Sequence, residues 1–144
     1  MLRRCIFGLM LVCPPLFAQE LTSFKAITQD LTVGKEIVVV ANLHHCTIDN
    51  PNTFDFPRNT IRLKPPVAVF NASSLTFDGH KFVKGLPSLP ENGIVEHISV
   101  NINAQGHMEG ILVIADAESN KKISGLDDIK FQCELGDGVH VYQG

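Results

Sequence analysis

Histidine and cysteine side chains are the groups in this sequence best suited to chemistry. His44 and His45 stand directly before Cys46, and imidazole and thiolate ligands suit zinc or copper. A metal site would combine His44 or His45 with His80 or His140, which are the four candidate ligands. No H-x-x-x-H pair falls on a predicted helix and no H-E-x-x-H motif occurs, so the competing interpretation is surface or hydrogen-bonded histidines.

The adjacent pair His44 and His45 further limits any metal site. If these residues belong to a strand, their side chains point to opposite faces, and at most one of them reaches a given site. A Cys46 thiol that is bonded to another cysteine cannot ligate a metal ion. We therefore predict no cofactor, and a periplasmic metal-binding protein that uses its histidines stays an alternative.

Nucleophilic catalysis has weaker signals. Ser73 and Ser74 lie between predicted strands without a G-x-S-x-G context, and turn formation explains them. Asp78 and His80 flank Gly79, a spacing that a hairpin turn also explains. We predict no catalytic residue and favour a protein that is not an enzyme, with an uncharacterised hydrolase as a further alternative.

Two cysteines remain once the N-terminal segment is set aside. Cys46 and Cys133 form an even pair near opposite ends of the domain sequence, and such a pair in an exported chain is most simply a disulfide. The chain-entropy model gives a bridge over so long a loop roughly 4 kcal/mol of stabilisation. A redox or metal thiol site is the alternative, and the absence of a C-x-x-C spacing weakens it.

The first 18 residues have the order of a secretory signal peptide. Arg3 and Arg4 form a positive start, an uncharged apolar stretch follows, two prolines interrupt it, and Ala18 offers a small residue for cleavage. The apolar stretch is too short to span a bilayer. We expect a leader at 1–18 and a single domain at 19–144, in the periplasm or secreted. A lipoprotein signal at Cys13 and a buried N-terminal helix are the alternatives.

Composition excludes some partners. The formal net charge is −3 and becomes about −5 without the two leader arginines, so the domain lacks the basic surface expected of nucleic-acid binding. No later segment approaches the roughly 20 apolar residues of a membrane helix. A protein or a small molecule is therefore the expected class of partner, with no nucleic acid and no transmembrane segment in the mature chain.

Hydrophobic periodicity predicts one helix and many strands. A helix from about Ser23 to Leu31 is indicated by apolar residues at i, i+3 and i+7, with Gly34 just beyond its end. Apolar or alternating stretches predict the strands, at 36–43, 61–63, 67–70, 75–77, 80–83, 97–102, 108–115, 129–135 and 139–142. Strands outnumber helices and do not alternate with them, which predicts a mainly β fold, an antiparallel sandwich or small barrel with one short N-terminal helix.

Turn residues predict how these strands connect. Asp78-Gly79 predicts a tight hairpin turn between two short strands, and the segment 103–106 predicts the turn of a longer hairpin. Gly136-Asp137-Gly138 predicts a hairpin turn between the last two strands, because it is too short for a phosphate-binding loop and precedes a strand.

Several ordered segments together resemble the VirK family of small exported bacterial proteins. They extend over nearly the whole of 19–144 and are Phe24–Ile27, Gly34–Val40, Cys46-Thr47, Leu75–Phe82, Phe131-Gln132-Cys133 and Gly136–Val139. The resemblance implies an exported, non-enzymatic binding or accessory protein, associated with virulence or host interaction. It also supports a Cys46–Cys133 pair, and it brings no catalytic residues to this chain.

Overall fold

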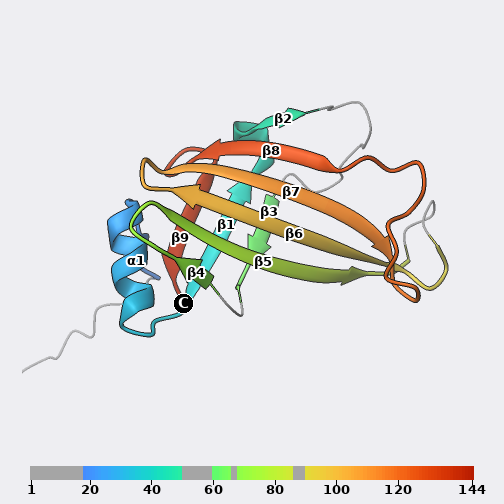
Figure 1. The fold of residues 1–144 in the computed structure, drawn as a ribbon, viewed down its shortest axis with the longest axis horizontal. Helices are drawn as coiled ribbons and strands as arrows, with labels where there is room; N and C mark the ends of the chain where they lie inside the picture. Colours follow the sequence, from blue (N-terminus) through green and yellow to red (C-terminus); the bar gives the residue numbers. More distant parts are fainter. Residues whose placement is uncertain (1–17, 50–59, 66–67, 86–89) are drawn as a thin grey trace, which may run out of the picture.

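The computed structural model describes residues 18–49, 60–65, 68–85 and 90–144 (Figure 1). The predicted leader up to residue 17 and the segment 50–59 lie outside the described residues. The elements in chain order are α1 (Phe24–Thr32), β1 (Ile37–Asn42), the 3-10 helix η1 (Leu43–His45), β2 (Thr47–Asp49), β3 (Thr60–Leu63), β4 (Ala68–Phe70), β5 (Ser74–Val83), β6 (Ile94–Asn103), β7 (His107–Asp116), β8 (Ile129–Glu134) and β9 (Val139–Gln143).

The strands form two antiparallel sheets. The larger has the order β2-β8-β7-β6-β5-β4, and the smaller has the order β3-β1-β9. Figure 1 shows the smaller sheet behind the larger one, with its strands crossing those of the larger sheet steeply and α1 at one end of the pair. The sheets are not closed on each other, so the predicted antiparallel sandwich with one N-terminal helix is confirmed and the barrel alternative is not.

The helix α1 begins and ends where its capping residues predict. The Ser23 side chain accepts a hydrogen bond from the Ala26 N–H at 3.2 Å, which satisfies one free donor of the first turn. Gly34, with φ of 78°, takes the left-handed conformation that ends the helix. The Lys35 N–H donates to the Asp30 carbonyl at 3.0 Å, which completes a Schellman motif.

The core fills the space between the sheets because their strands alternate. In β8 the residues Ile129, Phe131 and Cys133 are buried, while the residues between them are exposed. Ile27 of α1 is fully buried in the same apolar cluster. Each such side chain contributes about 1.5–3 kcal/mol relative to exposure, so burial explains why the short helix is held against the sheets.

The longest predicted hairpin is confirmed. β6 and β7 pair along their whole length, and the register places Ile102 opposite Met108. Gly106, with φ of 87°, closes the turn between them. Between β7 and β8 the chain contains no helix and only an isolated bridge, between Ala115 and Lys122.

The predicted hairpin turn at Asp78-Gly79 is wrong. β5 runs without a break through both residues and pairs with β6 from Ser74 to Val83. The glycine has a packing reason, because a Cβ at position 79 would lie 2.8 Å from Cδ2 of Leu63 in the other sheet. A local turn signal was therefore overridden by contact between the two sheets.

The predicted hairpin between the last two strands is also wrong. β8 pairs with β7 in the larger sheet, whereas β9 pairs with β1 in the smaller one. Gly136, with φ of 89°, helps the chain turn from one sheet to the other. The segment Gly136–Gly138 is a crossing between the layers of the sandwich.

Candidate functional site

The predicted disulfide is present and joins the two parts of the sandwich. Cys46 and Cys133 are bonded across a sequence separation of 87, with their Cα atoms 4.5 Å apart. Cys133 lies on the buried face of β8 and is only 3% exposed, while Cys46 caps η1 just after the central strand β1. The bond therefore ties the smaller sheet to the larger one.

Gly138 packs directly against this bond. A Cβ at position 138 would lie 3.0 Å from Cys46 Sγ, 3.0 Å from Cys133 Cβ and 2.8 Å from the carbonyl oxygen of His45. The Gly138 carbonyl accepts a hydrogen bond from the Asn42 N–H at 2.8 Å, so the backbone is held in place. Only glycine fits this crossing, and we call the group of Cys46, Cys133 and Gly138 the disulfide junction.

The junction predicts a strong effect of Gly138→Ala. The new methyl group would push apart a carbonyl and two cysteine side chains, and such overpacking costs about 1–3 kcal/mol. Denaturant unfolding of the purified domain measures this loss. Asp137→Ala, at the neighbouring exposed position, is the control and should change stability little. Equal stability of Gly138→Ala and the parent would contradict the tight packing.

His44 and His45 lie in η1, so the assumption that they belong to a strand is wrong. The Asn42 side chain accepts a hydrogen bond from the His44 N–H at 3.2 Å and so starts the short helix. Both histidines are exposed. His45 Nδ1 lies 3.0 Å from Oδ1 of Asp137 beside the disulfide junction, a surface contact that contributes little to stability.

The other two candidate ligands lie on opposite sides of the sandwich. In β5 the buried side chains are Leu75, Phe77 and Val83, so alternation places His80 on the outer face of the larger sheet. His140 lies between two buried valines of β9, on the outer face of the smaller sheet, and its Nδ1 is 2.6 Å from Oε1 of Glu20. The structure does not bring the four candidate histidines together.

A search of the described residues finds no group of three or more histidine, cysteine, aspartate or glutamate side chains placed to hold a metal ion. Within the same residues, no helix has the length and apolar character needed to cross a membrane. The serines considered for catalysis form a turn. Asn71 Oδ1 accepts hydrogen bonds from the Ser73 hydroxyl at 2.8 Å and from the Ser74 N–H at 3.0 Å.

A groove on the outer face of the larger sheet was not predicted. Its volume is about 400 Å³, and its lining includes Asp78 and His80 of β5, His97 of β6, and Ile111 and Val113 of β7. The register explains this grouping, because His80 lies opposite His97 and His97 lies opposite Val113. Alternation within each strand was visible in the sequence, but the pairing of β5 with β6 was hidden by the wrongly predicted turn.

His97 in this groove is oriented by a residue that the sequence did not single out. Its Nε2 lies 2.9 Å from Oδ1 of Asn120, in the loop after β7. Asn120 has φ of 53°, a left-handed conformation that asparagine adopts more readily than most residues. The loop therefore holds Nε2 of His97 through Asn120, and Nδ1 of the same ring takes no part in this contact.

Asp116 organises the same loop. The pKa of its carboxyl is lowered, first because it accepts a hydrogen bond from the Ser119 N–H, then because it accepts one from the Ser119 hydroxyl, with the Glu118 N–H adding a smaller effect. Both Ser119 donors lie 2.8 Å from Oδ1. The ionised carboxylate is thus the form that the folded loop favours.

This arrangement predicts that the loop opens in acid. A carboxyl whose pKa is lowered by folding stabilises the folded loop above its unfolded pKa of about 3.9, and this contribution is lost as pH falls through the folded value. Amide hydrogen exchange at Ser119 should therefore show less protection below about pH 4 once the intrinsic pH dependence of exchange is removed. Asp116→Asn should abolish this pH dependence, and its persistence in that variant would contradict the assignment.

No protein-family model matches the sequence, and no curated protein matches it. Among solved structures, the crystal structure of a VirK family protein from Legionella pneumophila is similar, with a TM-score of 0.73. The similarity covers 86% of this chain and 98% of the other, at 24% sequence identity. This chain has the VirK fold.

Three of the six segments that resemble the VirK family meet at the disulfide junction. Cys46-Thr47 and Phe131-Gln132-Cys133 supply the two bonded cysteines, and Gly136–Val139 supplies the crossing that packs on them. At 24% identity, the similarity to the solved structure establishes a common fold. The VirK fold here thus consists of two sheets, one end helix and a covalent tie between the sheets.

Proposed function

We propose that this chain is an exported, non-enzymatic binding or accessory protein of the VirK type, associated with virulence or host interaction. The observation that carries the binding role is the outer face of the larger sheet, which combines a groove of about 400 Å³ with exposed apolar side chains. Ile111 is 41% exposed and Phe82 is 57% exposed on this face. Exposed apolar residues beside polar groups on one face are typical of protein-binding surfaces.

The disulfide supports the exported part of the proposal. A bond between Cys46 and the buried Cys133 forms and persists in oxidising compartments such as the periplasm. The leader-like order of residues 1–18 points the same way. Gln19 and Leu21 hydrogen-bond to β9, so a chain that begins at Gln19 keeps the N-terminal segment of the smaller sheet.

The groove chemistry suits a protein surface or peptide as the partner. Apolar contacts at Ile111 and Val113 would supply the buried centre, while Asp78, His80 and Ser99 would supply polar contacts at the edge.

Site-specific crosslinking tests this working face. A photoreactive amino acid at Ile111, in the exported protein in intact cells, should give one discrete adduct with a partner of different mass. The adduct should disappear when Val113→Asp places a charge in the groove. The matched control is the same photoreactive residue at Val33, which is 70% exposed beside α1 and should give no such adduct. Equal labelling from both positions, or none from Ile111, would refute the face as the binding surface.

A further inference from the structure

Among the residues that the structure describes, the second half of strand β5 has no neighbouring strand on the side away from β6. β4 covers only its first part, since the register pairs Ala68 with Phe77 and Phe70 with Leu75. Beyond this point, no described strand pairs with the side of β5 that faces away from β6. Figure 1 shows this part of β5 running past the end of β4 along the lower margin of the larger sheet.

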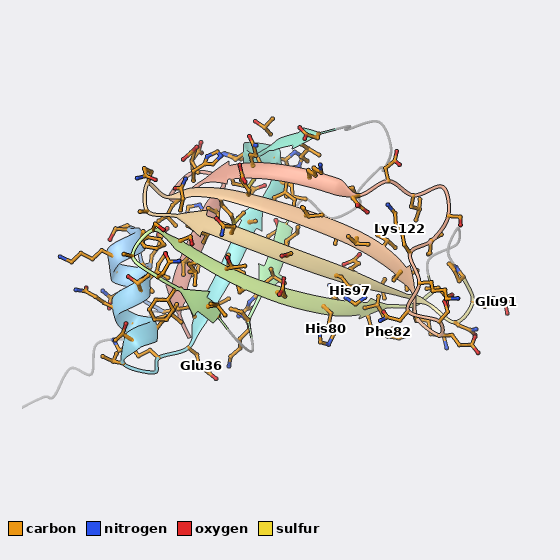
Figure 2. All side chains as sticks on the ribbon, in the orientation of Figure 1. Glu36, His80, Phe82, Glu91, His97 and Lys122 are labelled. Carbon is orange, nitrogen blue, oxygen red and sulfur yellow. A yellow bond between two sulfur atoms is a disulfide. The ribbon has the colours of Figure 1, made fainter. Side chains whose placement is uncertain are left out.

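This open edge is long enough to receive another strand. The residues from Asp78 to Val83 extend over about 20 Å at the usual rise of a strand. Outside the β5–β6 ladder, their backbone groups make no hydrogen bonds with described residues. Such an edge is a template for pairing with a further chain. Figure 2 shows His80 and Phe82 projecting from this part of β5.

We propose that a second copy of this chain pairs antiparallel with the open edge of β5. The charges along the edge favour this occupant because they are complementary under a twofold axis. The exposed Asp78 lies near one end, and the exposed Lys84 lies at the other. With the axis at Lys81, each Asp78 faces Lys84 of the second copy, and each His80 faces Phe82.

Lys81 opposes this pairing and weakens it. The axis places Lys81 opposite Lys81 of the second copy, and like charges directly opposite each other are unfavourable. In its own sheet, however, Lys81 pairs in register with Glu96, whose negative charge offsets part of this repulsion. The Asp78–Lys84 pairs, formed twice across the axis, must therefore outweigh this single like-charge contact, which keeps the pairing weak.

The resulting dimer would be weak and would extend the outer face. A short edge buries less than the roughly 1,200 Å² of a standard interface, so we expect a reversible dimer that forms with rising concentration. Edge-to-edge pairing would join two larger sheets into one continuous surface. A partner bound on that surface would meet two copies of the groove, and the second contact would be favoured by proximity.

Sedimentation equilibrium of the purified mature domain, at low ionic strength and up to about 1 mM, tests the proposal. The parent should show a reversible monomer–dimer equilibrium. Asp78→Lys alone and Lys84→Asp alone should each weaken association at least about tenfold, because each places like charges opposite each other. The double variant Asp78→Lys with Lys84→Asp should recover most of the parent's association.

Lys25→Asp, an exposed charge reversal on α1, is the matched control and should associate like the parent. Thermal unfolding of each variant checks that the fold is intact, and these surface positions should change it little. A parent that stays monomeric to the highest concentration would overturn the proposal. So would a double variant that associates no better than the two single variants.

Discussion

Replacing both cysteines, Cys46→Ala with Cys133→Ala, is expected to lower the free energy of unfolding by about 4 kcal/mol. The bond closes a loop of 87 residues, so its removal frees a large part of the unfolded chain. In a domain of this size the melting temperature should fall by about 15 °C. Denaturant unfolding measures this loss, and its slope should rise, because the unfolded chain without the bond exposes more surface.

The parent treated with a reductant is the matched comparison for this variant. Its stability should fall by a similar amount, since both treatments remove the same covalent link between the sheets. Alanine at the buried position 133 adds only a small cavity cost, because a thiol is small. A loss below about 1 kcal/mol in both cases would mean that the sandwich holds together without its covalent tie.

Gly110→Val is expected to destabilise the domain by about 3 kcal/mol or more. Gly110 lies in β7 directly opposite Phe131 of β8, and the phenyl ring lies over the glycine. A Cβ at position 110 would fall inside the van der Waals radius of the ring atoms. Phe131 is only 2% exposed and is packed in the core, so it has no free space in which to move.

A double-mutant cycle isolates this contact. Phe131→Ala alone should cost about 3–5 kcal/mol, because it leaves a cavity between the sheets. Adding Gly110→Val in that background should cost much less than it does in the parent, since the valine can enter the vacated space. Chemical unfolding of the four proteins gives the coupling. Additive losses would show that the ring and the glycine are not in contact.

Local signals were sufficient for the elements whose packing follows from their own sequence. The helix α1 could be predicted because Ser23 caps it, its apolar residues recur on one face, and Gly34 ends it. The β6–β7 hairpin could be predicted because its strands are adjacent in sequence and joined by a short turn with Gly106. In both cases local propensity and tertiary packing favour the same conformation.

The errors arose where distant contacts decide the backbone. Asp78-Gly79 is a strong turn signal, yet Leu63 from the other sheet occupies the space beside Gly79 and the strand continues. Gly138 was assigned to a hairpin because glycine is common there, whereas it is required by the cysteines on which it packs. No single-sequence pattern reports which sheet receives the next strand, because that choice depends on non-local pairing.

In the candidate site, too, features set by local sequence could be predicted, whereas features set by strand register could not. Cys46 and Cys133 could be paired from cysteine parity in a chain with a leader-like start, and the bond is present. The groove that contains His80 and His97 could not be predicted, since it depends on the register between β5 and β6. Once that register is known, the exposed residues of the outer face follow from simple alternation.

Intact-mass measurement of the protein taken from the cells that make it tests the central claim most directly, namely that this VirK-fold domain is exported and held by the Cys46–Cys133 bond. Alkylation without reductant before analysis would record the thiol state. The expected species begins near Gln19, carries no alkyl group and gains two after reduction. A chain that begins at Met1 with both of these cysteines alkylated before reduction would contradict the claim.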